Sequence, residues 1–331
     1  MYNGLEGNKL SAIPAFDTIS VDLQRVEDKM RRSLVTPNKV LTDILLYVLD
    51  SGGKRLRPAL ALLASSFNGP VSEKAVSLAA AVELLHTATL VHDDLIDNSM
   101  MRRGQVTLNA KWSSGATVLT GDLIFAQSAA LAAETANVEV ISIFAETLVT
   151  ICQGELRQLF GPRWREQSRE DYYNRIYAKT ASLFAAATEA GGVLCGLGER
   201  QIKSLREYGR ALGMAFQIVD DVLDFIGDQS EIGKPVGSDL RQGIMTLPAM
   251  LYVERNGHDE SLVHLLEGKE RREHAIVEVV SRIAASDAIP SAFDEARDFV
   301  ERGKGALAFL PDHPARSAML DLADYVIERR M

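Results

Sequence analysis

Two short segments of the chain each contain three aspartates at the same spacing. The first consists of Asp93, Asp94 and Asp97, and the second of Asp220, Asp221 and Asp224. Residues four apart share one face of a helix, where two like charges cost roughly 0.2–0.5 kcal/mol. A solvated helix end explains one such cluster equally well, but the same arrangement twice implies a compensating cation. Oxygen-rich, histidine-poor clusters favour Mg²⁺, which takes one or two carboxylates together with substrate phosphates, so two facing clusters would clamp a phosphate.

Several basic residues lie beside turn residues and could bind the phosphate that the aspartates and Mg²⁺ would hold. They are Lys54, Arg55 and Arg57 after Gly52 and Gly53, Arg102 and Arg103 before Gly104, and Lys234 after Gly233. Glycine allows close backbone approach to a ligand, and a following helix N-terminus attracts anions, so these groups suit diphosphate. Taken singly, each is better explained as solvated loop charge.

Two further polar residues lie within apolar helical segments. Lys179 precedes Thr180 among apolar neighbours, where a lysine needs an anionic partner. His86 lies about two turns before Asp93. It is either a satisfied core histidine or a residue that faces the ligand.

Composition limits the classes of protein that remain. The chain has 331 residues, 47% of them hydrophobic, and a net charge of −9, which excludes disorder and argues against binding to nucleic acid. With only Cys152 and Cys195, neither a disulfide scaffold nor a zinc site is expected, and a reducing cytoplasm is the predicted location. No secretory signal is recognised, and charges interrupt every long apolar run, so no membrane span is expected.

Helical spacing of apolar residues predicts the elements that must position these groups. Strand-like alternation is nearly absent, and prolines fall mostly between the periodic segments, so the fold class is all-α. Without a repeat or linker, one domain over 1–331 is expected, with residues 1–14 as an N-terminal arm. Long helices are predicted over 15–32, 38–50, 57–67, 72–98, 117–135, 138–160, 168–194, 199–226 and 241–256.

Taken together and in this order, the motifs resemble those of the trans-isoprenyl diphosphate synthases, or polyprenyl synthetases, over Leu41 to Arg330. The motifs are the two aspartate clusters, Gly52–Pro58, Arg102–Gly104, Lys179 with Thr180, and Gly233–Pro235 with Gly237 and Asp239. The resemblance implies an isoprenoid-synthase-type bundle of about ten core helices around a deep central cavity. It also implies a homodimer.

The resemblance further implies a role for each motif residue. Asp93, Asp97 and Asp220 would hold three Mg²⁺, with Mn²⁺ as a substitute, while Asp94, Asp221 and Asp224 would serve the shells around these metals. Arg102, Lys179 and Lys234 would bind the allylic diphosphate, and Lys54, Arg57, His86 and Arg103 the diphosphate of isopentenyl diphosphate. Thr180 and Gln217 would lie beside the reacting allylic carbon. The reaction would proceed by ionisation, condensation and elimination, with the departed diphosphate as the base.

Residues before the first aspartate cluster bear on product length. Thr89 and Ala88 lie four and five residues before Asp93, where they would line the start of a tunnel, and Leu85 lies deeper. Aromatic residues at these positions stop growth early in the family, so small ones imply a hexaprenyl to decaprenyl product. The alternative reading is that small residues merely let helices pack closely. Release of such a product would need transient membrane contact.

Three alternative functions remain open. Geranylgeranyl diphosphate is the second candidate product. A class I terpene cyclase is less favoured because the second motif here is a full Asp-Asp-x-x-Asp, and a non-catalytic subunit is less favoured because both motifs are complete. One departure is Ile244, where the family commonly has Lys, and Arg241 is a possible substitute for the missing charge.

Overall fold

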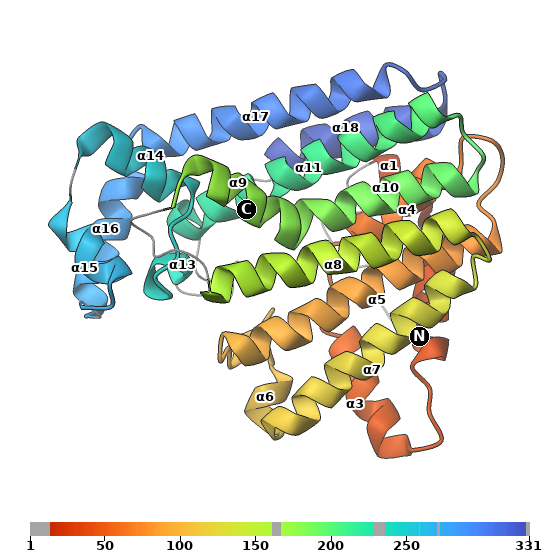
Figure 1. Ribbon diagram of the computed structural model, residues 1–331, viewed down its shortest axis with the longest axis horizontal. Helices are drawn as coiled ribbons and strands as arrows, with labels where there is room; N and C mark the ends of the chain where they lie inside the picture. The colour runs from red at the N-terminus through yellow and green to blue at the C-terminus, as the bar shows by residue number, and fades with distance from the viewer. Residues whose placement is uncertain (1–13, 161–166, 228–235, 258, 270–271, 329–331) are drawn as a thin grey trace. The chain divides into compact units, whose positions relative to one another are not determined.

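The computed structural model describes residues 14–160, 167–227, 236–257, 259–269 and 272–328. Within these ranges the chain is almost entirely helical, and its only strands form one hairpin, β1 (Met101–Arg102) paired antiparallel with β2 (Gln105–Val106). Figure 1 shows long helices connected by short loops. The predicted all-α class is therefore confirmed. Of the predicted N-terminal arm, only Pro14 lies among the described residues.

The helices of the first half are α1 (Pro14–Asp17), α2 (Ser20–Ser33), α3 (Lys39–Leu49), α4 (Leu56–Ser65), α5 (Glu73–Ile96), α6 (Leu108–Lys111), α7 (Ser114–Ala133) and α8 (Val138–Phe160). Those of the second half are α9 (Arg169–Ile176), the π-helical turn η3 (Tyr177–Ala181), α10 (Ser182–Leu194), α11 (Glu199–Ile226), α13 (Ser238–Arg241), α14 (Leu247–Asn256), α15 (Glu260–Leu266), α16 (Glu273–Ala284), α17 (Ala288–Leu307) and α18 (Pro314–Glu328).

Contacts divide the chain into two compact units. The first unit contains the described residues up to Thr147, with Leu183–Gly209 and Ala306–Leu322. The second contains Leu148–Ser182 and Arg210–Gly305, with the described residues from Ala323 onward. The single domain expected over 1–331 stays a prediction, and the two units are described separately below.

Helix α5 is the central helix of the first unit and packs against α2, α4 and α7. It starts at Glu73 because the Ser72 side chain caps it by accepting a hydrogen bond from the Ala75 amide at 3.2 Å. Leu84 and Leu85 are completely buried, and burial of a leucine contributes about 1.5–3 kcal/mol. Helices α5 and α7 lie side by side in Figure 1, joined by a 2.9 Å hydrogen bond from the Ser128 hydroxyl to the carbonyl of Ala81. The first aspartate cluster therefore stands on a well-anchored helix.

Three predicted helices differ from the structure. The range 15–32 is split between α1 and α2. The range 241–256 begins at the last residue of α13, and its helix, α14, starts only at Leu247, after Gly243 has taken a φ of +75°, with Pro248 in its first turn. The range 168–194 is helical throughout but contains η3, where the Ser182 amide donates to the Tyr177 carbonyl five residues earlier. The spacing of hydrophobic residues predicts neither the break at Gly243 nor the extra residue in the π-helical turn η3.

Two described helices, α5 and α7, are long and apolar enough to cross a membrane by length and composition alone. In α5, 78% of the most apolar stretch is buried, as in the core helix of a globular protein. In α7 the corresponding share is 39%, so a substantial apolar surface of this helix is exposed. The expectation that no segment spans a membrane stays a prediction.

Candidate active site

The first aspartate cluster lies at the C-terminal end of α5, and its three carboxylates differ in exposure. Asp94 is buried, Asp93 is partly exposed, and Asp97 is exposed as the residue that caps the helix. Asp93 and Asp97 share one helix face, and the Asp97 amide donates to the Asp93 carbonyl at 2.8 Å. The cluster thus separates into an outer pair and one inner carboxylate.

The inner carboxylate holds a basic residue of the following hairpin. Arg102 donates from both Nε and Nη2 to Oδ1 of Asp94, each at 2.7 Å. Charge-assisted hydrogen bonds of this kind are about twice as strong as those between neutral groups. They hold β1 against the end of α5, so that Arg102 stays close to the outer pair.

Arg103 connects the hairpin to the glycine-rich segment before α4. Its guanidinium donates to the carbonyl of Gly52. A Cβ on Gly53 would lie 2.9 Å from Nη1 of Arg103, which is closer than real Cβ contacts allow. A larger residue at this position would therefore displace the end of the Arg103 side chain.

Arg55 is a residue whose importance the sequence did not reveal. It adopts a left-handed φ of 49° just before α4 and donates to Glu27 of α2 and, at 2.7 Å, to Glu83 of α5. Burial alone would lower the pKa of Arg55, but the charges of Glu83 and Glu27 raise it above its ordinary value. The three side chains hold the turn that carries Lys54 and Arg57. The signal for this pairing was Glu83, a charged residue within an apolar helical segment, which needs a basic partner.

A pocket in the first unit brings several of the predicted residues together. Its lining includes His86, Asp94, Arg102 and Arg103, together with Arg55. Burial and the nearby charges of Arg57 and Arg103 lower the pKa of His86 well below its ordinary value of 6.5, so the imidazole is neutral at neutral pH. Positive charge concentrated around a neutral histidine is an environment that favours anions. Lys54, which is exposed, and Arg57, whose guanidinium stacks on Phe184 at 4.7 Å, lie outside the lining.

The second aspartate cluster lies at the C-terminal end of α11 and again has a buried second member. Asp221 is 4% exposed and accepts hydrogen bonds from the Tyr172 hydroxyl at 2.7 Å and from Nε2 of Gln217 at 2.9 Å. Burial raises the pKa of Asp221 to about 6, although both hydrogen bonds oppose this shift. Asp220 is partly exposed.

Asp224 has a role in the fold that the motif alone did not indicate. Its carboxylate accepts hydrogen bonds from the amide and the hydroxyl of Ser238, at 3.1 and 2.8 Å, and from the Asp239 amide at 3.2 Å. The third carboxylate of this cluster therefore fixes the start of α13.

Lys179 and Thr180 lie in the π-helical turn η3, an irregularity frequent at functional sites. The Thr180 hydroxyl donates to Oε1 of Gln217 at 2.6 Å, so the two residues predicted beside the reacting carbon are in contact. Lys179 pairs with Glu155 of α8 at 3.4 Å, but its side chain is exposed, so the expectation that apolar surroundings force it to take an anionic partner is wrong. A Cβ on Gly154 would lie 2.4 Å from that of Ala178, so glycine lets α8 approach η3 closely.

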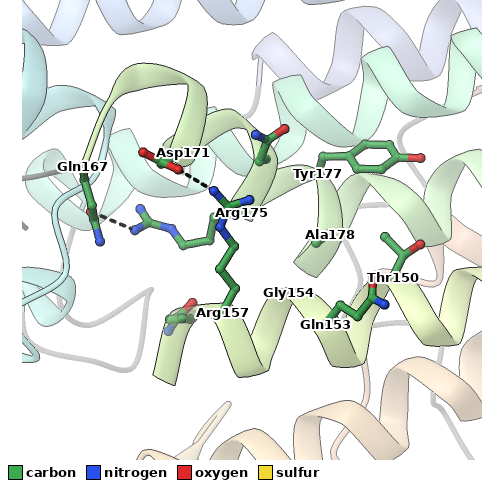
Figure 2. A pocket seen from close by; sticks show the side chains of 11 residues that line it. Thr150, Gln153, Gly154, Arg157, Gln167, Asp171, Arg175, Tyr177 and Ala178 are labelled. Atoms are coloured by element: carbon green, nitrogen blue, oxygen red, sulfur yellow. Dashed lines mark hydrogen bonds and ion pairs between the residues drawn. The ribbon is translucent and has the colours of Figure 1, made fainter. Parts of the chain in front are cut away.

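A cavity of about 370 Å³ lies between α8 and the α9–η3 segment, and none of the predicted site residues lines it. Figure 2 shows Arg157 and Arg175 close together in it, near Asp171. Arg157 pairs with Asp171 at 2.8 Å, and Arg175 donates to the Met245 carbonyl at 2.7 Å. This cavity could not be predicted from the sequence, because the residues that line it form no motif.

The donor set suits a hydrated Mg²⁺. Asp93 and Asp97 are two carboxylates on one turn, while Asp94 is already engaged by Arg102. Within the described ranges, no group of three or more His, Cys, Asp or Glu side chains is gathered for a metal. Mg²⁺ commonly takes one or two carboxylates and completes its shell with water and substrate phosphate, so these residues fit it.

The remaining predicted residues belong to neither aspartate cluster, and none of those that the structure describes lines the pocket beside Asp94. Lys234, with Gly233 and Pro235, lies outside the described residues. Ala88 is 2% exposed and Leu85 is completely buried, whereas Thr89 is partly exposed and donates to the His86 carbonyl at 2.8 Å. Arg241 donates to both carboxylate oxygens of Glu273, at 2.6 and 2.7 Å, and its substitution for the lysine absent at Ile244 stays a prediction.

Comparisons with known proteins agree with these motifs. The model of the polyprenyl synthetase family matches residues 38–283. The chain is 37% identical over 321 residues to heptaprenyl diphosphate synthase component 2 of Geobacillus stearothermophilus, covering 97% of this chain and 99% of that protein. It is 35% identical to octaprenyl diphosphate synthase of Haemophilus influenzae, covering 93% and 94% of the two chains.

A solved structure extends the similarity to the fold. The polyprenyl synthase of Caulobacter crescentus, solved with calcium and isoprenyl diphosphate, superposes with a TM-score of 0.91 at 35% identity over 96% of this chain and 97% of that chain. The matches also include a short chain isoprenyl diphosphate synthase of Methanothermobacter thermautotrophicus, at 34% identity.

Proposed function

Because the chain belongs to the polyprenyl synthetase family, we propose that it condenses isopentenyl diphosphate with an allylic diphosphate into a long-chain all-trans polyprenyl diphosphate. The observation that carries the proposal is the pocket beside Asp94, lined by His86, Arg102 and Arg103. Convergent basic groups next to a carboxylate cluster suit a diphosphate that binds together with Mg²⁺.

Each substrate is assigned its own set of basic residues. Isopentenyl diphosphate would be held by Lys54, Arg57, His86 and Arg103. The allylic diphosphate would be held by Arg102, Lys179 and Lys234. The positive surroundings of His86 and the hydrogen bonds from Arg102 to Asp94 support this assignment for the residues of the first unit.

Asp93, Asp97 and Asp220 would hold the Mg²⁺, with three ions per site. When bound, Mg²⁺ supplies positive charge that stabilises the leaving diphosphate. The basic residues bind the same leaving group as the allylic carbon–oxygen bond breaks and the diphosphate departs with the electron pair. Thr180 and Gln217 direct oxygen dipoles at the allylic cation. The isopentenyl double bond then forms the new carbon–carbon bond, and the departed diphosphate takes the proton that is lost.

A long product is favoured over geranylgeranyl diphosphate. Ala88, Thr89 and Leu85 have no aromatic ring that would block a growing chain, and relatives such as the octaprenyl diphosphate synthase of Haemophilus influenzae are named for long products. We assign the product to the range from hexaprenyl to decaprenyl.

We further propose a cytoplasmic homodimer that contacts membrane transiently when it releases product. The exposed apolar surface of α7, which includes Leu119 at 68% exposure and Val118 at 39%, supports burial against a second copy. Free Cys152 and Cys195 are consistent with a reducing compartment.

The test is incubation of the purified protein alone with isopentenyl diphosphate, farnesyl diphosphate and Mg²⁺, followed by chromatography of the dephosphorylated products. A ladder that ends in one dominant prenol of six to ten isoprene units is expected. A stop at geranylgeraniol would keep the reaction and overturn the product length. Hydrocarbons or alcohols formed from farnesyl diphosphate alone would indicate a cyclase.

An inactive protein has a specific follow-up. One relative is named component 2 of a heptaprenyl diphosphate synthase, so a second component would then be sought as a copurifying subunit. Elongation that starts only when such a subunit is added would replace the single-protein proposal with a heteromeric one.

A further inference from the structure

Four side chains in the second unit form one continuous line of hydrogen bonds. The Tyr172 hydroxyl donates to Oδ2 of Asp221 at 2.7 Å, and Nε2 of Gln217 donates to Oδ1 of the same carboxylate at 2.9 Å. The Thr180 hydroxyl donates to Oε1 of Gln217 at 2.6 Å. Each bond length is that of a well-formed hydrogen bond.

The direction of these bonds fixes how the Gln217 amide is oriented. An ionised carboxylate only accepts, so the amide nitrogen must face Asp221 and the amide oxygen must face Thr180. The opposite orientation would place Oε1 against the carboxylate oxygen and leave the Thr180 hydroxyl beside a donor. Asp221 therefore determines which end of Gln217 is presented to Thr180.

Burial makes the arrangement depend on Tyr172. Tyr172 is completely buried, and Asp221 and Thr180 are 4% and 5% exposed, so water has little access to replace a lost partner. The Tyr172 hydroxyl holds Oδ2 while Gln217 holds Oδ1. Without that hydroxyl the buried carboxylate would lose one of these two donors and would be free to rotate or shift.

We propose that Tyr172 is a positioning residue for prenyl transfer, acting through Asp221 to orient Gln217 and Thr180 toward the allylic substrate. This inference rests on the proposed function. Tyr172 lies in none of the sequence motifs and was not among the predicted site residues. Its effect falls on the ionisation step, because Gln217 and Thr180 are the groups assigned to the developing cation.

A packing role for the aromatic ring makes a different prediction. The ring of Tyr172 packs edge-on against Tyr173, with centroids 5.5 Å apart, and the Arg175 guanidinium lies 5.4 Å from its centroid. Phenylalanine at position 172 keeps the ring and these contacts and removes only the hydroxyl. The substitution Tyr172→Phe therefore separates positioning from packing.

The chain provides a matched control next to it. Tyr173 also directs its hydroxyl to a carboxylate, that of Glu295, which belongs to neither aspartate cluster. Tyr172→Phe should lower kcat for elongation of farnesyl diphosphate by about tenfold or more, with KM for isopentenyl diphosphate within about twofold of wild type. Tyr173→Phe should leave both parameters unchanged.

A double-mutant cycle tests the route through Gln217. In a Gln217→Ala background the residue that Tyr172 orients is gone, so adding Tyr172→Phe should cause little further loss of kcat. Equal kinetics for Tyr172→Phe and Tyr173→Phe, or independent losses in the cycle, would overturn the inference and leave the proposed function intact. An inactive wild-type protein would instead overturn both.

Discussion

The second carboxylate of each aspartate cluster differs in role from its neighbours, although all appear alike in the sequence. The Asp94 carboxylate accepts hydrogen bonds from Arg102, and the Asp221 carboxylate accepts them from Tyr172 and Gln217. Spacing predicts which aspartates share a helix face, and the assignment of Asp93, Asp97 and Asp220 to metal stays a prediction that the resemblance implies. It does not predict what lies opposite the buried face, because those partners come from distant segments. Tyr172 and Glu83, and the pairing of Arg55 with Glu27 and Glu83, were missed for the same reason.

His86 makes stability depend on pH. Its pKa lies below 6.5 in the folded chain, so between that ordinary value and the lowered one the unfolded chain binds a proton that the folded chain does not. The free energy of unfolding must therefore fall as the pH drops below about 6.5. Without ligand, the melting temperature of wild type should fall more steeply from about pH 7.5 to pH 5.5 than that of His86→Gln. Parallel curves would show that His86 is not held neutral.

At the scale of elements, helical spacing located most of the chain but not its irregular points. The helices predicted over 138–160 and 199–226 have the same bounds as α8 and α11, because their apolar periodicity is uninterrupted. The turn η3 and the break at Gly243 were missed, since neither alters the hydrophobic pattern. The motif residues Lys179 and Thr180 lie in η3, one of these irregular segments. Functional sites are where rules based on local sequence most often fail to predict the structure.

The contact of α5 with α7 gives a matched pair of glycine substitutions. A Cβ on Gly121 would lie 2.3 Å from Nε2 of His92, whereas a Cβ on Gly115 of the same helix meets nothing within 4 Å. Gly121→Ala should destabilise the protein by about 1–3 kcal/mol through overpacking. Gly115→Ala should be neutral or stabilise it by up to about 1 kcal/mol. Denaturant unfolding compares the two, and equal stabilities would refute tight packing of His92 on Gly121.

The tunnel assignment on α5 predicts a change of product. Ala88→Phe places an aromatic ring one turn before Asp93 and should shorten the dominant product, because the ring blocks the growing chain. Ala308→Phe, at an exposed alanine after the end of α17, is the control and should leave the product unchanged. Chromatography of dephosphorylated products measures both. An unchanged chain length in an active Ala88→Phe protein would refute the assignment.

At the scale of the whole molecule, the exposed surface of α7 predicts the oligomeric state. Leu119→Glu introduces charge at a side chain that is 68% exposed, and it should convert the proposed dimer to a monomer in light scattering. Val21→Glu, at 75% exposure on α2, is the matched control and should leave the dimer intact. Dimers from both variants would place the interface elsewhere.

Metal uptake is also a property of the assembled molecule. The proposed Mg²⁺ site has two carboxylates on one turn at the end of α5, those of Asp93 and Asp97, so water and diphosphate would complete the shell of the ion. Isothermal titration should show weak Mg²⁺ binding to the protein alone and clearly tighter binding with inorganic diphosphate present. Tight binding without diphosphate would contradict this dependence.

The division into two compact units also limits how such a protein can be inherited. The chain passes from one unit to the other five times, so neither unit is encoded by one continuous stretch of gene. Fusion or exchange of a gene segment cannot deliver or remove either unit by itself. Removing the whole of either unit by truncation also removes parts of the other, since the first unit extends to Leu322 and the second begins at Leu148. The two aspartate clusters, one in each unit, are therefore expected to be inherited together.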